Sequence, residues 1–199
     1  MPPTLQIQTV NGPAIAPWME ALARLRIAVF RDWPYLYAGT AAFEETYLEA
    51  YARSPRSLFV LALDGDSVVG CSTGVPLADE TENFRQPWSE RGHAPAQVFY
   101  FGESVLLPAY RGHGLGHRFF DAREHYARQL GGFLRTAFCA VDRSPDDPRR
   151  QVATRPLDGF WQGRGYQRHD DLKVHLPWAE IDSSGVEIPH TLTFWSRAL

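Results

Sequence analysis

The stretch that decides the fold is Val105-Leu106-Leu107-Pro108-Ala109-Tyr110-Arg111-Gly112-His113-Gly114-Leu115-Gly116. It joins a long apolar run to an amphipathic pattern through a loop with three glycines. Glycine lets the backbone adopt positive φ and approach a ligand closely. At a helix N-terminus the N–H groups point outward and the helix dipole favours an anion. The segment therefore fits a pyrophosphate site, and it equally fits a tight turn that binds nothing.

Two common phosphate motifs do not fit this segment. A P-loop needs Lys and Ser or Thr after its last glycine, whereas Gly116 is followed by His117 and Arg118. The dinucleotide fingerprint needs Gly-x-Gly-x-x-Gly near the first strand of a βαβ unit. Here the glycines alternate instead, as Gly112, Gly114 and Gly116.

The pattern Arg111-x-x-Gly114-x-Gly116, with Pro108 three residues before it, resembles the acetyl-CoA motif of the GNAT N-acyltransferases. That motif reads Gln/Arg-x-x-Gly-x-Gly/Ala. The segment 160–166, Phe-Trp-Gln-Gly-Arg-Gly-Tyr, is similar to the family's later Phe-Tyr-x-x-x-Gly-Phe. The resemblance covers nearly the whole chain. It implies one GNAT domain over residues 1–199, with an α/β (α+β) fold whose mixed, mostly antiparallel central sheet is flanked by helices.

Hydrophobic periodicity predicts the elements in the order β-α-α-β-β-β-α-β-α-β-β. Strands are expected over 5–10, 57–63, 67–76, 97–107, 134–141, 172–176 and 191–196. Helices are expected over 17–30, from a Thr40 cap to 53, over 114–130 and over 157–164. The polar segments 79–95 and 142–156 are predicted to be loops. Gly102 inside its apolar run indicates a bulge or a close backbone approach.

The amino-acid composition limits the classes of protein to which this sequence can belong. The 199 residues are 44% hydrophobic and 22% charged, as in a soluble globular domain. The net charge of −3 argues against broad binding of nucleic acid. No apolar run reaches the roughly 18 residues of a membrane span, and no leader pattern is visible. Two cysteines make no disulfide framework. We expect a cytoplasmic protein without nucleic-acid or membrane partners.

The resemblance also implies a cofactor site. Acetyl-CoA would be the co-substrate, its pyrophosphate held by backbone amides of the glycine loop. Its pantetheine arm would pair with the end of the preceding strand, which splays away from strand 134–141 and leaves a slot for the thioester. The implied cofactor-binding residues are Ser104, Val105, Leu106, Arg111, Gly112, His113, Gly114, Leu115 and Gly116. The side chain of Arg111 could instead form a salt bridge or a helix cap.

Members of this family transfer the acyl group by direct attack in a ternary complex. The acceptor amine must be neutral, and because a lysine-like amine has a pKa near 10.4, a base or a water relay must remove its proton. Glu103 is the predicted catalytic base, since it is a lone carboxylate in an apolar strand; the alternative is pairing with a loop arginine. Trp161 stands where many relatives carry a thiolate-protonating tyrosine, so Tyr166, Tyr110 or water would replace it.

Other chemistry-bearing residues have two interpretations each. Cys139 lies near the end of the strand on the other side of the expected slot, and it is either an acyl-accepting nucleophile or an inert buried thiol. Asp142 either meets the amine or serves a turn. His113, His117 and Asp121 are spaced by four on one helix, but a solvated face or a phosphate neighbour is favoured over metal ligation, so no metal is expected.

The acceptor is expected to contact the aromatic connection between the first two helices, residues 30–39. Its candidate substrate-binding residues are Trp33, Tyr35 and Tyr37. Aromatic walls suit an apolar, aromatic or cationic small molecule, although the same rings would also suit a core. Glu44 and Glu45 in the following helix would attract an amine, but helical carboxylates of this kind are usually solvated.

These observations favour an acetyl-CoA-dependent N-acetyltransferase that acts on a primary amine of a small molecule. One alternative is a protein or peptide amine acetyltransferase, which predicts an open groove where the aromatic connection suggests a lid. Another is a non-catalytic acyl-CoA-binding regulator of the same fold, which the Trp161 departure keeps open. A homodimer is expected only by analogy with the family.

Overall fold

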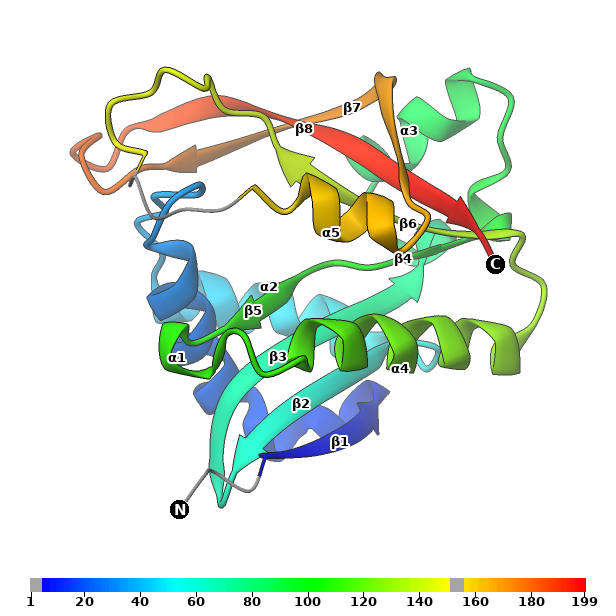
Figure 1. Ribbon diagram of the computed structural model, residues 1–199, viewed down its shortest axis with the longest axis horizontal. Helices are drawn as coiled ribbons and strands as arrows, with labels where there is room; N and C mark the ends of the chain where they lie inside the picture. The colour runs from blue at the N-terminus through cyan, green and yellow to red at the C-terminus, as the bar shows by residue number, and fades with distance from the viewer. Residues whose placement is uncertain (1–4, 151–155) are drawn as a thin grey trace.

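The computed structural model describes residues 5–150 and 156–199, which form an eight-stranded mixed sheet (Figure 1). The strands are β1 (Leu5–Asn11), β2 (Leu58–Asp64), β3 (Ser67–Pro76), β4 (Val98–Tyr100), β5 (Ser104–Leu106), β6 (Arg135–Val141), β7 (Gln167–Ala179) and β8 (Glu187–Ala198). Their order is β1-β2-β3-β4-β6-β8-β7, and β5 pairs with β3. Within these ranges β4 and β6 are parallel and the other pairs antiparallel. The predicted mixed, mostly antiparallel sheet is confirmed.

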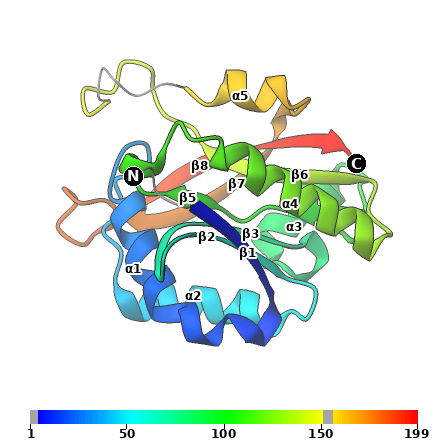
Figure 2. The same cartoon turned by 60° about the horizontal axis from the view of Figure 1, so that its bottom comes forward.

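Helices cover both faces of the sheet. They are α1 (Met19–Phe30), α2 (Ala41–Arg53), α3 (Glu82–Glu90), α4 (Leu115–Leu130) and α5 (Asp158–Gly163), with short 3₁₀ turns over 12–18, 77–79, 95–97 and 108–110. Figures 1 and 2 show α1 and α2 on one face and α4 and α5 on the other. In the described part of the chain, no helix combines the length and apolar character needed to cross a membrane.

Buried apolar side chains form a cluster on each face of the sheet. The larger cluster lies under α1, α2 and α3 and includes Leu22, Leu48 and Trp88, all fully buried. A second cluster, rich in aromatic rings, lies under α4 and α5 and includes Phe101 and Phe138. Because both faces are covered, the central strands carry continuous apolar runs rather than an alternating pattern.

Several predicted boundaries are confirmed. The hairpin β2–β3 turns at Gly65, whose φ of 59° requires glycine. The Thr40 side chain accepts a hydrogen bond from the Phe43 N–H, which is the expected cap of α2. The last two strands are longer than predicted, reaching 167–179 and 187–198, because polar outer residues extend the β7–β8 ladder beyond the apolar segments.

Two predictions about residues 79–107 were wrong. The predicted loop 79–95 contains helix α3, a polar helix that is anchored chiefly by the buried ring of Trp88. Its apolar pattern is too sparse to indicate a helix, and Pro87 inside it argues against one. The strand predicted over 97–107 is split into β4 and β5.

The split occurs at Gly102. The N–H of Phe101 donates to the Ala137 carbonyl of β6 (2.7 Å), but the next N–H, that of Gly102, donates to the Thr73 carbonyl of β3 (3.2 Å). A Cβ at Gly102 would lie 2.4 Å from the Tyr51 hydroxyl, so only glycine fits. The close approach expected at Gly102 is confirmed. Beyond this point β5 pairs with β3 and separates from β6, as the predicted splay requires.

Candidate functional site

The glycine loop precedes the first turn of α4. Gly112 and Gly114 have φ of 83° and 76°, which L side chains rarely adopt. A Cβ at either position would meet nothing within 4 Å, so the outer side of the loop is open. Leu115 is buried and fixes the start of the helix, whereas residues 111–114 are exposed. The loop thus presents backbone N–H groups at the N-terminus of a 16-residue helix, where an anion is favoured.

The strand before this loop has a free edge. The Glu103 carbonyl and the Leu107 N–H both bond to β3 (3.1 and 3.0 Å). Because backbone polar groups alternate along a strand, those of Ser104 and Leu106 point to the opposite edge, toward β6. The Arg111 Nε donates to the Leu106 carbonyl (3.2 Å), so this side chain folds back onto the strand. The remaining edge groups suit an extended ligand that adds like a strand.

A buried arginine supports the break between β4 and β5. Arg123 of α4 is only 1% exposed, and its guanidinium donates to the carbonyls of Thr73 (3.3 Å) and Glu103 (3.0 Å) and to the Ser104 hydroxyl (2.9 Å). The ring of Phe101 lies 4.2 Å from the same guanidinium. Burial lowers the pKa of Arg123 to about 10. Arg123 therefore adds hydrogen bonds to polar groups beside the break, where the pairing partner of β3 changes from β4 to β5.

The separation of β5 from β6 leaves a gap between these two strands. The predicted base, Glu103, lies at the end of this gap next to Gly102, in a cluster of acidic and aromatic side chains. One carboxylate oxygen is 2.7 Å from Arg26 Nη1, and the other accepts a hydrogen bond from the Tyr47 hydroxyl (3.0 Å). Arg26 also bonds to Glu44 of α2, which is fully buried. The expected loop-arginine partner of Glu103 is thus replaced by an arginine from helix α1. The expectation that Glu44 is solvated was wrong, while Glu45 is exposed as expected.

The opposite side of the gap carries Cys139 of β6. Its sulfur lies 3.0 Å from the hydroxyl of Tyr100, the last residue of β4. Burial raises the pKa of the Cys139 thiol to about 12, so the sulfur remains protonated near neutral pH. This environment disfavours the acyl-cysteine alternative. Burial also raises the pKa of the Tyr35 hydroxyl, and Cys139 and Glu103 raise it further.

The residues considered as replacements for the usual tyrosine acid have other partners. Tyr166 is buried and its hydroxyl hydrogen-bonds to Glu124 (3.1 Å) and Thr136 (2.8 Å). Tyr110 donates to Asp64 in the β2–β3 hairpin (2.8 Å). Trp161 packs on Phe138 and Trp195, with ring centroids 5.0 and 5.1 Å away. Its side chain serves the aromatic core beneath α5, so water is the remaining candidate of those first considered.

The aromatic connection is half-buried and tied to the β7–β8 hairpin. Tyr37 pairs with Glu180, the Ala38 N–H donates to the Ala179 carbonyl, and the Ile181 N–H donates to the Leu36 carbonyl. The ring of Tyr35 packs between Phe30 and Trp178, with centroids 4.7 and 5.9 Å away. Arg143 lies 5.6 Å from the ring of Trp33. The three predicted substrate residues thus lie in one segment, the strap (residues 33–37), which crosses the end of the sheet.

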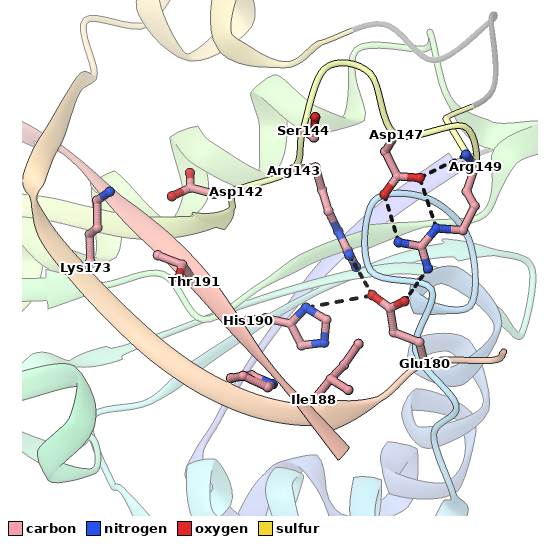
Figure 3. Close-up of a pocket in the computed structure, with 11 residues that line it drawn as sticks. Asp142, Arg143, Ser144, Asp147, Arg149, Lys173, Glu180, Ile188, His190 and Thr191 are labelled. Atoms are coloured by element: carbon pink, nitrogen blue, oxygen red, sulfur yellow. Dashed lines mark hydrogen bonds and ion pairs between the residues drawn. The ribbon is translucent and has the colours of Figure 1, made fainter. Parts of the chain in front are cut away.

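An open pocket of about 470 Å³ lies beside this strap (Figure 3). It is lined by Asp142, Arg143, Ser144, Asp147, Arg149, Lys173, Glu180, Ile188, Pro189, His190 and Thr191. Glu180 is buried between Arg143 (2.6 Å) and Arg149, and its carboxylate lies 3.8 Å from His190 Nδ1. Arg143 also donates to the carbonyls of Pro34 (2.6 Å) and Tyr35 (3.0 Å), which links this pocket to the strap.

Other sequence candidates are occupied by structural contacts. Asp142 accepts hydrogen bonds from Arg168 and Thr193, so its carboxylate holds the end of β6 to β8. His117 and Asp121 both contact Arg164 of the segment after α5. No group of His, Cys, Asp and Glu able to hold a metal is found among residues 5–150 and 156–199.

Sequence reasoning missed Arg26, Tyr47 and Tyr100, which lie around Glu103 and the gap. One signal was present: Arg26 lies on the apolar stripe of its helix beside Leu22 and Leu25. A charged residue on a buried stripe is rarely left unpaired.

The acetyltransferase (GNAT) family model matches residues 22–158, which is more than half of the chain. Comparison with curated proteins gives no significant match. Solved structures are similar over nearly their full length. An N-acetyltransferase from Staphylococcus aureus Mu50 has a TM-score of 0.62 at 11% identity and covers 98% of both chains. Arabidopsis thaliana NAA60, in complex with a bisubstrate analogue, has a TM-score of 0.61 at 11% identity, covering 98% of this chain and 99% of its own.

A third similar structure is that of yncA from Salmonella typhimurium with its cofactor acetyl-CoA. Its TM-score is 0.54 at 13% identity, and the match covers 98% of this chain and 94% of that one. At these identities the structures show the fold, and the family model shows the class. The chain belongs to the GNAT family of acetyltransferases, a class of acyltransferases that uses acetyl-CoA.

Proposed function

We propose that this protein transfers an acetyl group from acetyl-CoA to a primary amine of a small molecule by direct attack. The observation that carries this proposal is the gap between β5 and β6, with the open glycine loop at one end and Glu103 at the other. Loop amides of 111–116 and the free edge at Ser104 and Leu106 fit the anionic and extended parts of this co-substrate. Acetyl-CoA supplies the activated acyl group as a thioester.

The proposed role of Glu103 is to accept the proton of the acceptor amine, directly or through water. Its carboxylate is fixed by Arg26 and Tyr47 and lies beside the gap. Tyr100, whose hydroxyl lies 3.0 Å from the Cys139 sulfur, is the proposed proton donor to the leaving thiolate. Burial raises its pKa well above the ordinary value, so the hydroxyl keeps its proton near neutral pH. Water remains the alternative donor.

A small-molecule acceptor is favoured over a peptide because the strap at 33–37 is fastened to the β7–β8 hairpin by backbone hydrogen bonds. A peptide acceptor needs an open groove at this place, which the strap covers. The half-buried rings of Tyr35 and Tyr37 suit an amine with apolar or cationic character.

The test is a screen for CoA release with a panel of small amines and matched peptides, combined with thermal unfolding in the presence of acetyl-CoA. We expect acetyl-CoA to raise Tm, and Gly114→Val to abolish that shift because φ of 76° excludes a β-branched side chain. The exposed Gly159→Ala serves as the control substitution.

Glu103→Gln should lower kcat by about 100-fold or more while the acetyl-CoA shift of Tm persists. Full turnover by this variant at every pH rules out the base role. A Tm that does not respond to millimolar acetyl-CoA rules out the co-substrate assignment. Binding of acetyl-CoA without CoA release from any amine or peptide supports a non-catalytic regulator instead, and preferential use of peptides supports the protein-acetylating alternative.

A further inference from the structure

Arg26 is shared between two buried carboxylates. Its guanidinium bonds to Glu44 and lies 2.7 Å from Glu103, and the side chains of all three residues are at most 8% exposed. The guanidinium also covers the ring of Tyr47 at 4.1 Å and that of Phe30 at 5.0 Å. A guanidinium suits this role because its planar fork reaches two acceptors at once.

Charge is not balanced within this group. Two buried carboxylates face one cation, and among the described residues one oxygen of Glu44 and one of Glu103 lack a hydrogen bond. Attraction to Arg26 favours the charged form of each carboxylate, whereas repulsion between the two carboxylates disfavours it. The charge on Glu103 therefore depends on both Arg26 and Glu44.

We propose that Arg26 and Glu44 are positioning residues that set the protonation of Glu103: Arg26 holds Glu103 as a fixed carboxylate, and Glu44 competes for Arg26 and weakens that hold. This proposal rests on the proposed function, in which Glu103 takes the proton of the amine. Neither residue needs to touch the acceptor, since each acts through Glu103.

Among the titratable groups that surround Arg26, Glu44 and Glu103, all but one keep the same protonation state at working pH. The titratable or charged groups that face the cluster are Tyr35 and Tyr37 from the strap, Tyr47 and Tyr51 from α2, Cys71 from β3, Tyr100 from β4, Glu80 and Arg123. Burial raises the pKa values of the tyrosines and of Cys71, so these groups are neutral at working pH. The exception is Glu80, which bonds to Tyr51 and whose pKa is also raised by burial.

The experiment measures the acidic limb of the kcat/KM profile in paired variants, using the best amine from the panel. Arg26→Gln should move this limb to higher pH by about one unit, because Glu103 loses its cation. Glu44→Gln should move it to lower pH, because Arg26 then serves Glu103 alone. A purely structural role would lower activity without opposite displacements. Arg26→Lys should retain most of the limb position.

Matched controls lie on the same helices. Arg24→Gln and Glu45→Gln remove exposed charges next to Arg26 and Glu44 and should leave the limb in place. Glu80→Gln tests whether Glu80, rather than Glu103, produces the acidic limb of the kcat/KM profile. If this limb disappears in Glu80→Gln and persists in Glu103→Gln, the proposal is overturned. Displacements of the two main variants in the same direction overturn it as well.

A second readout does not depend on catalysis. Removing one partner of a buried ion pair leaves an uncompensated charge, so Arg26→Gln should lower Tm, and adding Glu103→Gln to it should restore part of the loss. If the Glu103 change lowers Tm equally with and without Arg26, the two residues are uncoupled and the proposal fails. If no amine is acetylated but the coupling is found, the proposed function fails while the charge linkage stands.

Discussion

Single residues decide where the sheet of this acetyltransferase opens. Gly102 lets the backbone pass within reach of Tyr51 and Thr73, and Arg123 hydrogen-bonds to backbone carbonyls beside the break. A buried guanidinium is costly unless its donors are used, and here four acceptors use them: the carbonyls of Phe119, Thr73 and Glu103 and the Ser104 hydroxyl. The break is thus stabilised from the side of α4, independently of any ligand.

Arg123→Met should therefore destabilise the protein by about 2–4 kcal/mol, since three backbone carbonyls and the Ser104 hydroxyl lose a charge-assisted donor. For a chain of this size that corresponds to a Tm lower by roughly 5–15 °C in a thermal melt. Arg128→Met, at an exposed site on the same helix, should change Tm by no more than about 1–2 °C. Equal effects of the two substitutions would contradict the role given to Arg123.

At the scale of elements, the strap at 33–37 is held from outside by the segment after β6. Arg143 donates to two strap carbonyls and pairs with Glu180, and Trp178 donates to the Tyr35 carbonyl (3.1 Å). Three segments that are far apart in the sequence are thereby tied together, and Figure 3 shows the ion pair between Arg143 and Glu180.

Arg143→Met should loosen the strap. Because the acceptor is proposed to bind there, its KM should rise about tenfold, the effect of losing one or two charge-assisted hydrogen bonds. The Tm shift caused by acetyl-CoA should be unchanged, since the glycine loop lies elsewhere. Arg31→Met, an exposed change at the end of α1, is the control. A loss of the acetyl-CoA shift without a change in KM would contradict this assignment.

The same elements show what the sequence could predict. The glycine loop, the β2–β3 hairpin and the Thr40 cap follow from local rules, so their positions were predictable. Helix α3 was not, because its stability comes from one buried tryptophan contacting distant strands. Arg26 and Glu44 lie on apolar helical stripes, yet their pairing with Glu103 depends on how α1, α2 and β5 assemble, and no spacing within one segment reveals it.

For the whole molecule, the buried histidine His190 links stability to pH. Burial and Arg143 lower the pKa of His190 below its ordinary value near 6.5. The unfolded chain then binds a proton at this residue at a higher pH than the folded protein does. Its contribution to stability is therefore complete above about pH 6.5 and declines as pH falls toward the lowered folded pKa.

His190→Gln should consequently flatten the fall in Tm between pH 7 and pH 5. His175→Gln, an exposed change on the neighbouring strand, should leave the slope as it is. Melting curves at half-unit pH intervals measure the difference. A steeper slope in His190→Gln than in the wild type would show that the imidazole gains protons on folding, contrary to this account.

The break at Gly102 also affects the mechanics of the whole molecule. In the described residues, the half made of β1, β2, β3 and β5 meets the half made of β4, β6, β8 and β7 through only two ladder pairs, Val75 with Tyr100 and Pro76 with Phe99. Two stiff half-sheets joined over so short a junction can rotate slightly against each other while both keep their own hydrogen bonds. Backbone hydrogen bonds therefore do not fix the width of the gap by themselves; side-chain packing in the apolar cluster that both halves share sets it as well.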